Sequence, residues 1–101
     1  TRFKLGYTEN VPSIKPYDEA AWAELADVKE LPVNISITLL YALHRRWHSF
    51  LQSFKDDDWQ RTVFHPEYKK EHTLWHYLQL YAWHGRHHVA QINFLRDKMQ
   101  W

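Results

Sequence analysis

The chain of 101 residues is 45% hydrophobic and 17% aromatic, and its formal net charge is +1. This length fits one domain, and the hydrophobic content is far above that of a disordered chain. The nearly balanced charge argues against nucleic acid as a partner, and no apolar run reaches the roughly 20 residues that cross a bilayer. The lack of cysteine excludes disulfides, thiolate zinc sites and cysteine nucleophiles. We therefore expect one domain over residues 1–101, located in the cytoplasm, with no membrane partner.

Short elements are expected in the N-terminal third of the chain. Residues 2–5 have helical character over only about one turn, and an isolated turn is not stable in water. Two prolines within residues 10–17 predict a loop. A short helix is then expected over residues 18–26, because Asp18 is a favourable N-cap and Glu19 suits the first turn.

Two long helices are expected in the rest of the chain. Apolar and aromatic side chains recur at steps of three and four residues in two segments without proline, 34–55 and 73–99. Asn34 and Thr73 are the candidate N-caps, since the side-chain oxygen of each can accept a hydrogen bond from an unpaired N–H of the first turn.

The connection between the long helices is predicted to be irregular and then extended. Three consecutive aspartates, residues 56–58, are expected to form a solvated cluster that ends the first helix. Residues 60–67 are predicted to be strand-like, because Pro66 disfavours the helical conformation for His65.

Two helices side by side bury only the seam between them, so the remaining apolar surface needs a cover. Either the short N-terminal elements fold across the helix pair, or two copies associate so that four long helices share one interior. We favour the second arrangement, because helices on the order of 35–40 Å long suit lengthwise packing in a bundle. The expected fold is all-α, and the expected assembly is a homodimer.

Metal-ligating side chains are concentrated on the two long helices. The chain has eight histidines, and His84 and His88 are four residues apart, so their rings project from one helix face. A neutral imidazole binds Zn²⁺ or Ni²⁺ well, and two at this spacing can hold one ion without distorting the backbone. The alternative is that both are buried histidines, hydrogen-bonded to tyrosine or amide groups.

The first long helix repeats this spacing with His44 and His48. If the two helices are antiparallel in a suitable register, these rings approach the pair on the second helix. Three histidines and a water leave the open position that metal catalysis requires, whereas four histidines close a structural site. A further pair, His72 and His76, is expected to lie on the surface, because charged residues precede it.

The order of motifs along the chain resembles a known family. The motifs are Arg2-Phe3-Lys4-Leu5, Ile14-Lys15-Pro16-Tyr17-Asp18-Glu19, Trp22-Ala23-Glu24-Leu25, Leu43-His44-Arg45-Arg46-Trp47, His65-Pro66-Glu67 and Tyr81-Ala82-Trp83-His84-Gly85-Arg86-His87-His88. Together they resemble the DinB superfamily, in particular its YfiT-like branch of proposed metal-dependent hydrolases, which includes the bacillithiol S-transferases. The resemblance extends over essentially the whole chain, and the last motif is a specific signature.

The resemblance implies a four-helix bundle in which three histidines hold zinc or nickel. Two of the three match His84 and His88, whereas the third lies on a helix upstream of the segment that aligns with Arg2. The chain is therefore expected to be the C-terminal helix pair of a truncated DinB-like bundle, completed by homodimerisation. His48 stands where the family usually has an apolar residue, so it is a candidate replacement ligand, and Gln91 stands where relatives often have histidine.

The sequence thus predicts a metal-dependent hydrolase, or a thiol transferase of related chemistry, that acts on a small-molecule substrate. His84, His88 and His48 are the expected ligands of a divalent ion, with zinc or nickel favoured. The candidate general base is His44, His48 itself or a chain of water molecules. Tyr81, with Tyr77 one turn away, is a candidate donor to developing charge, although core packing is the commoner use of such tyrosines. Two alternatives stay open: a non-catalytic helical homodimer that a metal stabilises, and a metal-free fragment with packed histidines.

Overall fold

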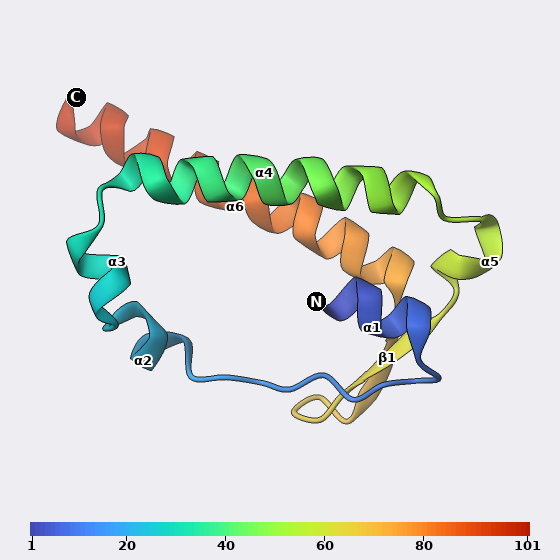
Figure 1. The fold of residues 1–101 in the computed structure, drawn as a ribbon. Coiled ribbons are helices and arrows are strands. Elements are labelled where there is room, and N and C mark those ends of the chain that lie inside the picture. Colours follow the sequence, from blue (N-terminus) through green and yellow to red (C-terminus); the bar gives the residue numbers. More distant parts are fainter.

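The computed structural model describes residues 1–101, which form six helices and one two-stranded sheet. Figure 1 shows α4 and α6 running in opposite directions, with the other elements arranged along them. In chain order the elements are α1 (Arg2–Thr8), α2 (Glu19–Ala23), α3 (Ala26–Glu30), α4 (Val33–Gln52), α5 (Asp56–Trp59), β1 (Thr62–His65), β2 (Lys70–Thr73) and α6 (Leu74–Met99). The prediction of a mainly helical chain is confirmed, since the sheet is small.

The two long helices lie close to the predicted ranges. Thr73 caps α6 as predicted, because its hydroxyl oxygen accepts a hydrogen bond from the N–H of His76 at 3.1 Å. The predicted cap of α4 is wrong: Pro32 precedes the helix, and Asn34 lies inside the first turn, where its carbonyl accepts from Thr38. Proline suits this boundary because its fixed φ angle is compatible with entry into a helix.

The short helices differ from the prediction in length and number. Asp18 caps α2 by accepting from the N–H of Ala21 at 2.9 Å, as predicted, but the helix ends at Ala23 and α3 follows as a separate element. The aspartates at positions 56–58 do not only end α4. They form α5, in which the Asp58 carboxylate accepts from the N–H of Lys55 at 2.9 Å.

The predicted extended piece is β1, and its partner strand, β2, was not predicted. The strands are antiparallel, with Val63 opposite His72. The loop before α2 also joins this sheet, because the N–H of Phe64 donates to the carbonyl of Pro12 at 2.9 Å. The hairpin therefore ties the N-terminal loop to the beginning of α6.

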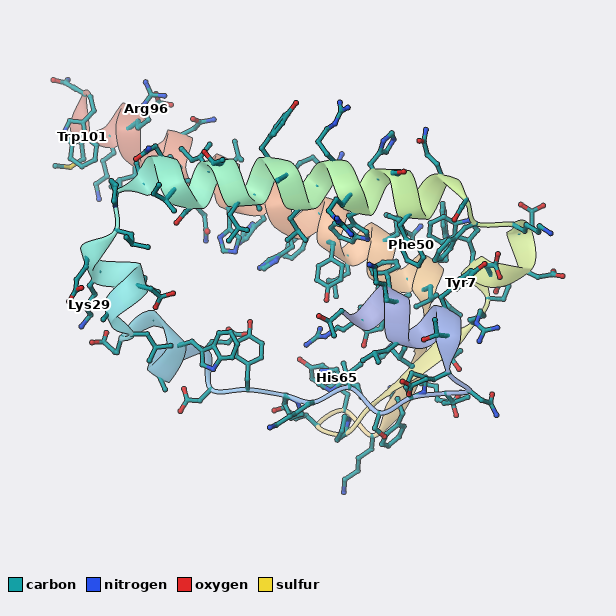
Figure 2. All side chains as sticks on the ribbon, in the orientation of Figure 1. Tyr7, Lys29, Phe50, His65, Arg96 and Trp101 are labelled. Atoms are coloured by element: carbon teal, nitrogen blue, oxygen red, sulfur yellow. The ribbon has the colours of Figure 1, made fainter.

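The buried core lies at one end of the molecule, where α1 fits between α4, the hairpin and the start of α6 (Figure 1). It consists of Phe3, Ile14, Val63, Leu74 and Tyr77. Aromatic side chains extend it. Tyr7 of α1 packs edge-on against Phe50 of α4 with ring centres 5.6 Å apart (Figure 2). At this end the short N-terminal helix does cover the helix pair.

The other end of the molecule is open. Apolar side chains of α4 and α6 remain exposed there, among them Ile37 (60%), Leu40 (54%), Ile92 (59%) and Leu95 (47%). The radius of gyration is 16.4 Å, whereas a compact domain of this length has about 13 Å. None of the helices combines the length and apolar content that crossing a lipid bilayer demands.

Candidate metal centre

His84 and His88 meet on one face of α6. Their Nε2 atoms are 2.9 Å apart, and the ring centres are separated by 4.4 Å. The pair lies on the same face of α6 as Tyr77, which is buried in the core. Tyr77, Tyr81, His84 and His88 follow one another at steps of three or four residues, which places them on one helix face. Both imidazoles are exposed, since they lie beyond the point where α1 covers this face.

Gln91 orients the second ring of the pair. Its side-chain oxygen, Oε1, lies 3.0 Å from Nδ1 of His88. An amide oxygen only accepts hydrogen bonds, so Nδ1 carries the proton, and the lone pair on Nε2 of the neutral ring accepts the hydrogen bond that joins it to Nε2 of His84. This is the arrangement of a metal-ligating histidine, whose other nitrogen donates to a nearby oxygen.

The pair suits one divalent ion but does not complete its coordination. Two nitrogens bound at about 2.0–2.1 Å to one ion can be at most about 4.2 Å apart, which the separation of 2.9 Å satisfies. Within the chain, however, no cluster of three or more His, Cys, Asp or Glu side chains is suited to hold a metal. Residues 1–101 therefore supply only part of the ligand set that one divalent ion takes.

The structure does not bring His48 to this pair within one chain. His48 is exposed and makes no hydrogen bond, and no group of three such side chains that could hold a metal forms within the chain, so its role as a ligand stays a prediction. The helices are antiparallel, and α1 contacts both of them, since Phe3 packs against Trp47 and Tyr81.

His44 lies nearer to the level of the pair. Trp47 of α4 packs edge-on against Tyr81 of α6, and in antiparallel helices the next turn then places His44 level with His84. Nδ1 of His44 is 2.9 Å from the carbonyl oxygen of Leu40, so this nitrogen donates. The lone pair of its Nε2 is consequently free in the neutral ring.

Tyr81 lies between the core and the histidine pair. Its hydroxyl oxygen accepts a hydrogen bond from Nη1 of Arg2 at 3.0 Å. The hydroxyl hydrogen is not used in that bond and can be donated elsewhere. Arg2, a residue that sequence reasoning placed only in a helical stub, thus positions a candidate site residue.

The sequence did not predict that a second group of histidines is partly buried near the start of α6. His65 is buried at 7% exposure, and His72 is half-buried, so only His76 of the pair expected on the surface is exposed. The rings of His72 and His76 stack with their centres 4.6 Å apart. Burial, together with the nearby His76, lowers the pKa of His72. One signal in the sequence could have indicated the burial of His65. Alternate residues of a strand share one face, so a strand that buries Val63 also buries His65.

Two neighbouring cavities flank this region. One, of about 220 Å³, is lined by residues from α1, the hairpin and the start of α6. The other, of about 450 Å³, lies along α2 and α3 and reaches His84, and its walls include Trp22, Leu25 and Val28. Tyr17 and Glu19 line both cavities. The histidine pair is therefore adjacent to a largely apolar hollow.

The structure is that of a helical-bundle protein with a candidate metal centre. The centre consists of a histidine pair suited to a divalent ion, next to a hollow. The chain belongs to the DinB superfamily, whose family model matches residues 2–92. The resemblance noted from the motifs is thus confirmed.

Relatives and a solved structure agree with this assignment. Two relatives whose names propose metal-dependent hydrolases, from Bacillus mycoides (strain KBAB4) and Bacillus cereus (strain 03BB102), are each 50% identical over 99% of the chain. YfiT from Bacillus subtilis, described as a proposed metal-dependent hydrolase with an unusual four-helix bundle topology, matches 99% of the chain with a TM-score of 0.94 and 45% identity. The chain spans 57% of the length of each of these proteins.

Proposed function

We propose that the chain acts in metal-dependent hydrolysis of a small-molecule substrate, with His84 and His88 as ligands of Zn²⁺ or Ni²⁺. The observation that carries this proposal is the convergence of the two Nε2 atoms at 2.9 Å, with Gln91 fixing the proton of His88 on the opposite nitrogen. The names of the relatives, which propose the same chemistry, support it. A thiol transferase would use the same site with a thiol in place of water.

A divalent ion at this site would supply Lewis-acid activation of water or of a thiol near neutral pH. His44 is suited to accept a proton, because its Nδ1 donates to a carbonyl and leaves the Nε2 lone pair free. Tyr81 is suited to donate a hydrogen bond to developing negative charge, since the bond from Arg2 leaves its own hydrogen available.

We propose that a second copy of the chain completes the site, with His48 of the partner subunit as the third ligand. The accessible surface is 8757 Å², whereas a compact protein of this mass exposes about 6,100 Å². The excess of about 2,600 Å² exceeds the roughly 800 Å² that each partner buries in a stable interface. The exposed apolar side chains of α4 and α6 described above are part of this surface.

Metal binding tests the ligand assignment directly. Calorimetric titration of Zn²⁺ or Ni²⁺ into metal-free protein is expected to show saturable binding that His88→Ala weakens by at least about tenfold. His87→Ala is the matched control, because His87 lies on the same helix but stacks on Trp83. Equal affinities for both variants would contradict the assignment.

Ultracentrifugation and His48→Val test the assembly. We expect a dimer whose metal affinity falls in the His48→Val variant, and a monomer with unchanged metal affinity would refute the role of the second copy. An ester-hydrolysis assay with and without chelator then separates catalysis from structure. Metal binding without chelator-sensitive hydrolysis would favour the non-catalytic, metal-stabilised homodimer.

A further inference from the structure

We infer that the hollow of about 450 Å³ along α2 and α3 binds an organic ammonium ion with an apolar body, and that such ions are the substrate class of the candidate metal centre. Binding of the ammonium ion does not depend on the metal, whereas its role as substrate rests on the proposed function. In Figure 1, α2 and α3 lie below the two long helices, and of these two only α6 contributes to the hollow, through His84.

The size and the walls of the hollow suit a small organic molecule. Its volume lies within the range of about 300–1,000 Å³ that is usual for small-molecule sites. Most of the lining residues are apolar, among them Leu25 and Val28, whose side chains are 51% and 58% exposed. A ligand with an apolar body would remove part of this surface from water, which favours binding.

The fixed charges of the hollow are negative. The carboxylates of Glu19, in the first turn of α2, and of Asp27, in the first turn of α3, both line it, and no lysine or arginine does. Neither carboxylate is neutralised within the chain, since the one ion pair joins Lys29 to Glu24. Arg2 lines only the smaller, neighbouring cavity. The hollow therefore attracts a positively charged ligand and repels an anion.

An aromatic pair gives the same preference by a separate interaction. The rings of Tyr17 and Trp22 both line the hollow, with their centres 4.6 Å apart. The two side chains are 51% and 59% exposed, so that ring surface is open to a ligand. The face of an aromatic ring attracts a cation, and tryptophan does so most strongly. An ammonium group beside Trp22 would thus interact with the ring as well as with the carboxylates.

The same walls favour an organic ammonium ion over a bare metal ion. Glu19, Asp27 and His84 do not form a group of three side chains that could hold a metal. Apolar walls also cannot replace the water that a metal ion would lose on entry. A primary ammonium group, in contrast, has three N–H donors for carboxylate oxygens, while its organic remainder can contact Leu25 and Val28.

The hollow connects the bound ion with the candidate metal centre. His84 lines the hollow, and its Nε2 atom is 2.9 Å from Nε2 of His88. An ammonium compound held by α2 and α3 can therefore extend to the histidine pair. The substrate that this arrangement favours carries a positive charge at one end and its hydrolysable bond toward the other end.

Tryptamine and tryptophol test this inference on the full chain. Both have the same indole-ethyl body, but only tryptamine carries an ammonium group at neutral pH. In an NMR titration of isotope-labelled, metal-free protein, we expect tryptamine to shift the indole signals of Trp22 in a saturable way. Tryptophol is expected to bind about five- to tenfold more weakly, because it lacks the charge. Equal binding of the two probes, or no binding of either, would overturn the inference.

Variants locate the bound ammonium group. Asp27→Asn is expected to weaken tryptamine binding about three- to fivefold and to leave tryptophol binding unchanged. Glu30→Gln is the matched control, because it removes a negative charge from the same helix at a residue that does not line the hollow. Glu19→Gln repeats the test from α2 if Asp27→Asn does not fold. Tryptamine losses no larger than in Glu30→Gln would refute the site.

The ring signals of His84 test the role as substrate. Tryptamine is expected to shift them as well, because His84 lines the same hollow. Shifts at Trp22 without shifts at His84 would refute the connection with the metal centre. These titrations contain no metal, so their failure leaves the proposed ligands of the ion unaffected. Failure of the calorimetric metal titration would, in turn, leave the binding of the ammonium ion in place.

Discussion

The two glycines of the chain occupy helices, and alanine is expected to have opposite effects at the two positions. At Gly85 an added Cβ meets no atom within 4 Å, so the substitution gains helix propensity alone. That gain is about 1 kcal/mol, or about 4–8 °C in Tm for a domain of this size. At Gly6 the added Cβ would lie 2.7 Å from Cδ2 of Leu74 and 2.9 Å from Cγ1 of Val63.

Those two neighbours cannot move aside easily. Leu74 and Val63 are each 0% exposed in the centre of the core. Overpacking of this kind costs about 1–3 kcal/mol. Because both variants gain similar helix propensity, the difference between Gly85→Ala and Gly6→Ala isolates the overpacking energy.

Urea denaturation followed by circular dichroism measures this difference. We expect Gly85→Ala to be more stable than Gly6→Ala by about 1–3 kcal/mol, with similar m-values. Equal stability would refute the packing of α1 on the hairpin and α6. The measurement is repeated at several protein concentrations, because a second copy packed against Gly85 would reverse the gain and make it depend on concentration.

Three further predictions concern the polar groups. Gln91→Leu is expected to weaken metal binding by about 10–100-fold in calorimetry while leaving the circular dichroism spectrum unchanged, since only the orientation of His88 depends on it; an unchanged Kd would contradict this. Above about pH 10 the free energy of unfolding is expected to fall less in Tyr77→Phe than in the unmodified chain. The pKa of Tyr77 is raised in the folded chain, so this tyrosine ionises first in the unfolded chain and destabilises the fold. Parallel curves of unfolding free energy against pH would speak against this prediction. His72→Gln is expected to flatten the loss of stability as pH falls below about 6.5, because the lowered pKa of His72 means that protonation favours the unfolded chain; an identical acid limb would be inconsistent with its burial.

Features that depend on neighbouring residues in the sequence could be predicted. Asp18 and Thr73 act as N-caps because each side chain bonds to an N–H three residues later, which requires no tertiary information. The approach of His84 and His88 is likewise a property of one helix. The starts of α2 and α6 and the approach of the histidine pair were accordingly accessible from the sequence.

Features that depend on tertiary contacts could not be predicted from the sequence. The periodic pattern of α4 continues to Phe54, but the helix ends at Gln52 and Phe54 packs against Trp59 of α5 with ring centres 4.7 Å apart. The segment that forms β2 is polar and has no strand pattern, so its pairing with β1 determines its conformation. That pairing also sets His72 opposite Val63, next to the cavity that sequence reasoning missed.

The concentration of the core at one end has a consequence for the order of α6. Beyond Tyr81 this helix has no buried residue, and a free helical arm of such length is only marginally stable in water. Backbone amide exchange should therefore accelerate from the middle of the helix toward Met99. A cation bound by two rings one turn apart would stabilise this stretch of helix against fraying. Loading with zinc or nickel would therefore be visible as slower backbone amide exchange, without any measurement of activity.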